Sequence, residues 1–113
     1  MADVTLTVQE PDVDGLTVTR VAGSTANTYY ADNASGSLKL LFVKTGAGAC
    51  TVTFVTPRTV DGLAVANPTA TVAATTGDVA CGAFVPKTYN DALGRVSFTV
   101  DEATGLTIAA IKG

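Results

Sequence analysis

The chain is 113 residues long, the usual size of one domain, which allows a single core and leaves no room for a second. Hydrophobic residues make up 47% of it and charged residues only 15%, so the composition excludes a disordered or highly solvated chain. The formal net charge of -3, with the 7 Lys and Arg residues scattered along the sequence, excludes the clustered basic surface of a nucleic-acid-binding protein.

Two further features indicate the class of fold and the compartment. The chain is rich in Thr and Val, whose β-branched side chains favour sheets over helices, so we expect an all-β protein. The first residues lack the pattern of a secretory signal, and no apolar run approaches the length of a membrane span, about 18 residues or more. We therefore expect a protein that is made in the cytosol and does not act in a membrane.

The N-terminal segment alternates between apolar and threonine side chains. Val4, Leu6 and Val8 share one face of an extended segment, and threonines occupy the other. This period of two predicts a half-buried strand over residues 4–8. Because the strand starts the chain, residues 1–8 are also the obvious candidate for an extended N-terminal arm or an edge strand.

A second strand is expected after the turn at Asp14-Gly15. Alternation resumes over residues 16–21, so this segment and residues 4–8 are predicted to form a hairpin or its open equivalent. Residues 22–37 are rich in Gly, Ser, Asn and Ala and show no alternation. We expect them to form a long loop, of the kind that is usually functional or mobile.

The most apolar run of the chain predicts the centre of the sheet. Residues 38–43 carry apolar side chains on both faces apart from Lys39, which is typical of a central strand covered on each side. The glycines of residues 46–48 predict a turn, and residues 50–56 alternate again. These two strands are the strongest hairpin candidate in the sequence.

More short strands and a helical turn are expected in the second half. Pro57 ends a strand because proline cannot donate to a ladder, and Asp61-Gly62 marks a turn. A helical turn is expected over residues 89–93. The other expected strands are residues 70–73, 78–85, 96–100 and 106–111. A total of about seven or eight short, mainly antiparallel strands predicts a single domain over residues 1–113, built as a β-sandwich or small β-barrel.

The sequence offers no constellation for catalysis, for a cofactor or for a metal. It contains no histidine, and no spacing brings a nucleophile beside a base, so we expect no enzyme, no bound cofactor or metal and no small-molecule substrate. Cys50 and Cys81 lie too far apart for a CxxC motif. Two buried thiols are the favoured interpretation, and a disulfide between neighbouring strands is the alternative.

The adjacent pair Tyr29 and Tyr30 is the sharpest surface signal. Neighbouring aromatic side chains in a polar loop are suited to anchor an interface, because Tyr supplies a large contact area at low entropic cost. The alternative is that one of the two rings folds back onto the edge of the sheet.

The middle and the second half of the chain resemble a known class of protein. Two stretches are unusual together: Val60-Asp61-Gly62-Leu63-Ala64-Val65-Ala66, preceded by Thr56-Pro57, and Phe84-Val85-Pro86-Lys87-Thr88-Tyr89-Asn90-Asp91. With residues 38–43, 46–48, 50–57 and 94–98, they resemble small virion proteins of tailed bacteriophages that are encoded among the head genes.

This resemblance implies a capsid decoration, or cement, protein. Such a protein is a β-rich structural module that is made in the cytoplasm of the host bacterium and binds the outer surface of an assembled capsid. Its partner is the major capsid protein, whose neighbouring subunits it holds together. Proteins of this class commonly attach as trimers or other small homo-oligomers.

The N-terminal third has no counterpart in the resemblance, and only its own pattern of side chains indicates its role. Residues 1–8 are suited to augment a neighbour's sheet through main-chain hydrogen bonds, and their deletion is expected to abolish assembly binding while leaving most of the fold. The candidate interface residues are Val4, Leu6, Val8, Tyr29 and Tyr30.

Three other functions fit parts of the sequence. A head-tail joining or minor tail component would assemble at one vertex, and its copy number would distinguish it from a decoration protein. An immunoglobulin-like or carbohydrate-binding adhesion module would need surface aromatic and polar groups on a concave face, and the chain has no Trp. A self-associating cytosolic β domain also fits the low content of charged residues.

Overall fold

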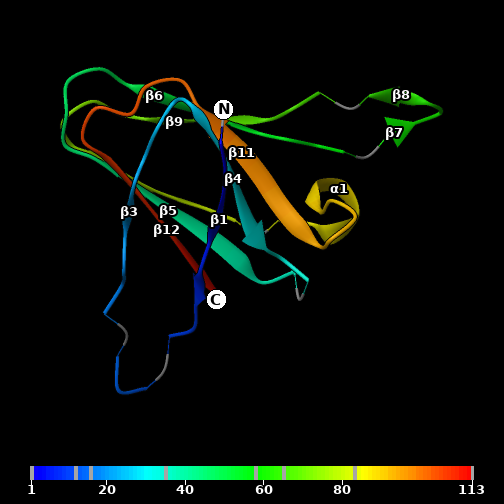
Figure 1. The fold of residues 1–113 in the computed structure, drawn as a ribbon, viewed down its shortest axis with the longest axis horizontal. Coiled ribbons are helices and arrows are strands. Elements are labelled where there is room, and N and C mark those ends of the chain that lie inside the picture. The colour runs from blue at the N-terminus through cyan, green and yellow to red at the C-terminus, as the bar shows by residue number, and fades with distance from the viewer. Residues whose placement is uncertain are drawn as a thin grey trace.

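The computed structural model describes residues 2–11, 13–15, 17–34, 36–57, 59–64, 66–82 and 84–112, and Figure 1 shows their arrangement. The first sheet has the strand order β1 (Ala2–Leu6), β4 (Asn27–Asp32), β11 (Arg95–Val100), β6 (Cys50–Phe54) and β9 (Thr69–Val72). The second has the order β10 (Gly77–Cys81), β5 (Leu38–Lys44), β12 (Leu106–Lys112) and β2 (Val8–Gln9), with β3 (Val21–Ala22) also paired to β12. The remaining elements are the two-stranded ribbon of β7 (Thr59–Val60) and β8 (Leu63–Ala64), and the helical turn α1 (Pro86–Tyr89).

The expected all-β class and the sandwich architecture are confirmed. The described residues contain 12 strands, more than the sequence predicted, because four of them are two-residue segments that are too short to show alternation. Most pairings are antiparallel, as expected, although β1 pairs with β4 and β2 with β12 in parallel.

One core lies between the two sheets. Burial alternates with period two along β5 and β6, so that Phe42 and Phe54 point inward with their strand neighbours. The Phe98 ring of β11 is stacked on Tyr29 with ring centroids 5.3 Å apart and meets Phe42 edge-on at 5.5 Å. These aromatic contacts join strands of both sheets and fix how the sheets pack.

The predicted central strand is confirmed, with one difference. β5 lies between β10 and β12 in the second sheet, and its inward face is fully buried. On the outward face Lys39 is exposed while Leu41 and Val43 are half-buried. The sequence predicted cover on both faces, but only the inner face is completely covered.

The predicted hairpin between residues 4–8 and 16–21 is wrong. β1 and β2 pair with β4 and β12, and β3 pairs with β12 in antiparallel orientation. The Asp14-Gly15 turn is present, with Gly15 at a φ of 92°, but the chain around it connects strands that do not pair with each other. A local turn signal shows that the chain reverses and does not identify the strand that will accept its hydrogen bonds.

The predicted hairpin between residues 38–43 and 50–56 is also wrong, because β5 and β6 belong to different sheets. The connection between them is fixed by other loops: the Thr45 N–H donates to the Gly105 carbonyl, and the Gly46 carbonyl accepts from the Thr75 N–H. A Cβ on Gly46 would lie 2.2 Å from the Thr104 carbonyl oxygen, so the glycine is needed for this close approach.

Two shorter elements differ from their predicted bounds. The strand expected over residues 78–85 ends at Cys81, and Gly82 follows with a φ of 151° against the backbone of Leu38. The helical turn expected over residues 89–93 lies earlier, as α1, and starts at Pro86, where a missing N–H costs nothing.

Candidate interaction surfaces

The N-terminal candidates lie against the protein's own core. Leu6 is buried, and Val4 and Val8 are half-buried and pack against the core cluster. The predicted common face therefore points into the sandwich, and residues 2–9 form an edge strand of this chain instead of a free arm. Contact of these residues with a partner stays a prediction.

The tyrosine pair is divided between the core and the surface, as the alternative interpretation predicted. The segment expected to be a loop forms β4, and a strand sends successive side chains to opposite faces. Tyr29 is completely buried, and its hydroxyl lies 3.4 Å from the Ala22 carbonyl oxygen. It is therefore a core residue, and its prediction as an exposed anchor is wrong.

Tyr30 lies on the outward face of β4 and is half-buried. The Arg95 guanidinium is 4.3 Å from its ring centroid and is also held by Asp91, with 3.3 Å between the nearest nitrogen and oxygen. Burial acts to raise the pKa of the Asp91 carboxyl, but the N–H groups of Arg95 and Leu93 and the guanidinium outweigh it and lower that pKa. Of the predicted tyrosine pair, only Tyr30 has any exposed ring.

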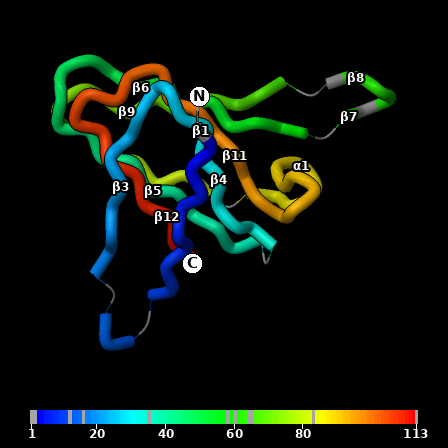
Figure 2. Tube along the Cα trace, in the orientation of Figure 1, coloured from blue at the N-terminus to red at the C-terminus, as the bar shows by residue number. Residues whose placement is uncertain are grey.

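A projecting hairpin is the most distinct surface feature, and none of the predicted interface residues lies on it. We call residues 57–66, of which 58 and 65 lie outside the described part, the β7–β8 arm. Its turn at Asp61 and Gly62 has φ values of 52° and 77°, as a two-residue type I′ turn requires. Figure 2 shows the arm and the connection between β2 and β3 extending from the two sheets in different directions.

The base of the arm is closed by side-chain hydrogen bonds. Asn67 Oδ1 accepts from the Thr56 N–H at 2.9 Å and from the Thr56 hydroxyl at 2.8 Å. Below this pair, the Phe54 N–H donates to the Pro68 carbonyl at 3.0 Å. These bonds hold the two ends of the arm together where it leaves the sandwich.

The segment containing α1 is tied to the fold by a pair of asparagines. Asn33 is buried, and its Nδ2 donates to the Phe84 carbonyl at 3.0 Å and to Asn90 Oδ1 at 2.8 Å. Asn90 Nδ2 in turn donates to the Asn33 carbonyl at 3.0 Å. This segment is therefore presented on a rigid base.

Three of the large exposed apolar side chains lie on these two segments. Leu63 on the arm is 72% exposed, and Val85 and Leu93, which flank α1, are 56% and 73% exposed. Figure 1 shows α1 and the arm toward the same end of the longest axis, so we call Leu63, Val85 and Leu93 the apolar end. The Asp-Gly turn between Pro57 and Pro68 was the sequence signal for the arm, but its projection depends on tertiary structure.

A buried lysine holds the other end of the sandwich together. Lys44 has no exposed surface, and its ammonium donates to the Thr104 carbonyl and lies 3.8 Å from Glu102 Oε1. Hydrogen bonds from Thr104 lower the pKa of the Glu102 carboxyl, burial opposes them, and the charge of Lys44 adds a smaller lowering effect. The ion pair fixes a loop, and Glu102 and Thr104 also line an open pocket of about 550 Å³ together with Ser24 and Thr25.

Both cysteines are free thiols, so the favoured interpretation is supported over a disulfide. Cys50 is buried and Cys81 half-buried, and burial raises the pKa of each thiol. Among the described residues, no group of three or more His, Cys, Asp or Glu side chains is placed to hold a metal ion. In the same part of the chain, no helix is long and apolar enough to cross a membrane.

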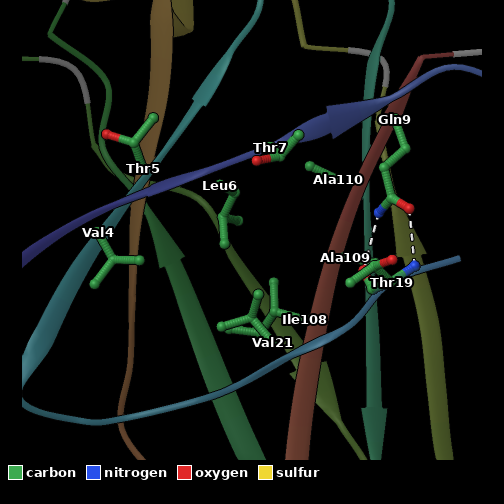
Figure 3. Close-up of a pocket in the computed structure, with 10 residues that line it drawn as sticks. All are labelled: Val4, Thr5, Leu6, Thr7, Gln9, Thr19, Val21, Ile108, Ala109 and Ala110. Carbon is green, nitrogen blue, oxygen red and sulfur yellow. Dashed lines mark hydrogen bonds between the residues drawn. The ribbon is translucent and has the colours of Figure 1, made fainter.

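A cavity of about 290 Å³ lies beneath the N-terminal edge strand. Figure 3 shows Leu6 above Ile108 and Val21, with the Gln9 side chain bonded to the backbone of Thr19 at one end. The other lining residues are Val4, Thr5, Thr7, Ala109 and Ala110. The lining combines apolar side chains with three threonines and Gln9 and carries no charged side chain, and the cavity lies between β1, β2, β3 and β12.

Comparison with known proteins adds no further likeness: no protein-family model matches the chain, and no curated protein or solved structure is found to match it.

Proposed function

We propose that this protein is a non-enzymatic decoration protein that binds the outer surface of an assembled phage capsid. It stabilises the capsid by holding neighbouring subunits of the major capsid protein together. The apolar end is the surface that makes the contact. Its partner is the shell of the major capsid protein, and the protein is located on the virion.

One observation carries this proposal. The two stretches that carry the resemblance to virion proteins, residues 60–66 and 84–91, are the arm and the segment around α1. Both point toward one end of the molecule, and together with the turn before β11 they expose Leu63, Val85 and Leu93. Exposed apolar side chains on rigid bases are typical of interaction surfaces.

Two described features of the arm restrict its conformation before it binds. A two-stranded hairpin alone is marginally stable in water, but here a type I′ turn fixes the tip and the Thr56–Asn67 hydrogen bonds fix the base. Order before binding reduces the entropy cost of association. The arm is therefore suited to insert between neighbouring shell subunits.

The alternatives receive less support from the described residues. A glycan-binding module needs exposed aromatic rings, yet each of the 4 Phe and 3 Tyr residues is buried or half-buried. A head-tail joining or minor tail component would use a similar surface, so copy number must separate it from decoration.

The first experiment is co-sedimentation of the purified protein with capsids of the phage whose genome carries this gene. A copy number comparable to that of the major capsid protein supports decoration. A number that fits a single ring at one vertex supports the joining or tail role instead. No binding to either filled or empty expanded capsids overturns the proposal.

A matched pair of variants tests which surface binds. Leu63→Asp places a charge at the apolar end and is expected to weaken capsid binding by about tenfold or more. Val13→Asp makes the same change at a residue that is 99% exposed on the other projection, and it is expected to bind as the unchanged protein does. Equal binding by both variants would exclude the apolar end as the contact surface.

A further inference from the structure

Residues 2–9 belong to both sheets. β1 forms the edge of the first sheet and pairs in parallel with β4 from Ala2 to Leu6. After Thr7 the chain continues as β2, which pairs in parallel with β12 at Val8 and Gln9. We call residues 2–9 the terminal strand. It lies at an edge of each sheet, next to β4 in the first and next to β12 in the second.

The connection after the terminal strand is strongly exposed. Every described residue of the segment 10–20 is exposed except Val18, which is half-buried, and Figure 1 shows the segment extending away from the sheets. At its base, Gln9 Nε2 donates to the Thr19 carbonyl at 2.9 Å, and Gln9 Oε1 accepts from the Thr19 N–H at 2.8 Å. Because the connection is already exposed, moving it away from the sandwich uncovers little additional apolar surface.

The terminal strand is also packed less closely than the inner strands. The cavity of about 290 Å³ lies between it, β3 and β12, as Figure 3 shows. Of its three alternating apolar side chains only Leu6 is fully buried, while Val4 and Val8 are half-buried. Side chains that line this cavity have no protein atoms on that side, so detaching the terminal strand breaks fewer packing contacts than detaching an inner strand would.

We propose that the terminal strand exchanges between copies of this chain, so that residues 2–9 of one copy pair with β4 and β12 of a second copy. The partner that fills the vacated surface is a second copy, because all copies have the same sequence. The surface vacated by the terminal strand is already complementary to residues 2–9, and every copy carries the same residues. Exchange replaces each contact within a chain by the same contact between chains.

The length of the connection permits this exchange. Residues 10–20 reach roughly 36 Å when fully extended. The second dimension of the molecule is 36 Å, so a neighbour placed beside the sandwich is within reach. Reciprocal exchange closes a dimer, and head-to-tail exchange closes a ring such as a trimer. The inference does not depend on the proposed capsid binding, because the partner is the chain itself.

A cross-link between two different chains tests the exchange. Asp3 and Thr28 are register partners in β1 and β4. Paired strands lie about 4.8 Å apart, within the range that a disulfide bridges. An Asp3→Cys chain and a differently tagged Thr28→Cys chain are refolded together, oxidised and separated without reductant. We expect a linked dimer that contains both tags.

The control replaces Thr28→Cys by Asp78→Cys, an exposed position on β10 at the edge of the second sheet. This pair is expected to give no linked dimer above the level of the unchanged protein. A single chain carrying both Asp3→Cys and Thr28→Cys reports whether the strand pairing tolerates the substitutions. If that chain closes its own disulfide while the mixed chains give no more dimer than the control, the proposal is overturned.

Changing the length of the connection provides a second measurement. Deleting residues 13–15 shortens the connection and strains its return to the same chain, so the fraction of oligomer measured by light scattering is expected to rise. Inserting a Gly-Ser segment at the same point is expected to lower it. An oligomer fraction that responds to neither change overturns the proposal.

Discussion

The hydrogen bonds at the base of the arm allow a quantitative prediction for Asn67→Ala. The substitution removes the oxygen that accepts both the N–H and the hydroxyl of Thr56. Thr56 is only 7% exposed, so water replaces these bonds poorly. The Thr56 N–H loses this acceptor, while the hydroxyl keeps the Ala66 carbonyl at 3.4 Å, so we expect the free energy of unfolding to fall by about 1–3 kcal/mol.

Urea unfolding at neutral pH measures this change, with Asn67→Asp as the matched control. Aspartate retains an acceptor oxygen at the same place, so both donors of Thr56 stay bonded and the free energy of unfolding should be close to that of the unchanged protein. Thr56→Val removes only the hydroxyl and should cost about 0.5–1.5 kcal/mol. If Asn67→Ala and Asn67→Asp unfold at the same urea concentration, the base of the arm does not depend on these bonds.

Three further predictions concern the core, the acid limb of stability and the thiols. Phe98→Ala removes a ring that contacts three other aromatic rings and should lower the free energy of unfolding by about 3–5 kcal/mol in the same urea assay. The carboxyl pKa values of Asp91 and Glu102 are lowered in the folded state, so their contribution is complete above about pH 4, the ordinary range of these groups, and is lost as the pH falls through the folded values. The double variant Asp91→Asn, Glu102→Gln should therefore flatten the fall of the urea midpoint between about pH 5 and pH 3, and an unchanged slope would contradict this reasoning. Because burial raises both thiol pKa values, Cys50 and Cys81 should react slowly with a thiol reagent in the folded protein and rapidly in urea, with Cys50 the slower of the two.

The sequence predicted strands better than it predicted their partners. Residues 96–100 and 106–111 lie within β11 and β12 as expected, because alternation of apolar side chains directly reports a strand with one buried face. The predicted hairpin of residues 38–43 with 50–56 failed because the pattern carries no information about which sheet accepts each strand. That choice depends on contacts between loops distant in sequence, such as the approach of Gly46 to Thr104.

The candidate site was predicted only in part. Tyr29 and Tyr30 fall on opposite faces because their segment is a strand. The strand was missed because its residues, Asn, Thr, Tyr, Tyr, Ala and Asp, lack the apolar alternation that identified other strands. The turn at Asp61-Gly62 was recognised, since its residue types are those that a type I′ turn requires. The contact that closes the base was not, because Thr56 and Asn67 are brought together only by the pairing of β6 with β9.

Deletion of residues 1–8 was expected from the sequence to leave most of the fold, but the structure indicates that it destabilises the sandwich. It removes Leu6 from the core, which alone contributes roughly 1.5–3 kcal/mol, and it exposes the edges of β4 and β12. Loss of capsid binding by this variant would therefore not distinguish a contact surface from a destabilised sandwich. Point changes on the outward side are cleaner: Thr5 and Thr7 are exposed, so Thr5→Lys and Thr7→Lys should preserve the urea midpoint. If they also preserve capsid binding while Leu63→Asp abolishes it, the apolar end, and not the terminal strand, is the surface that meets the shell.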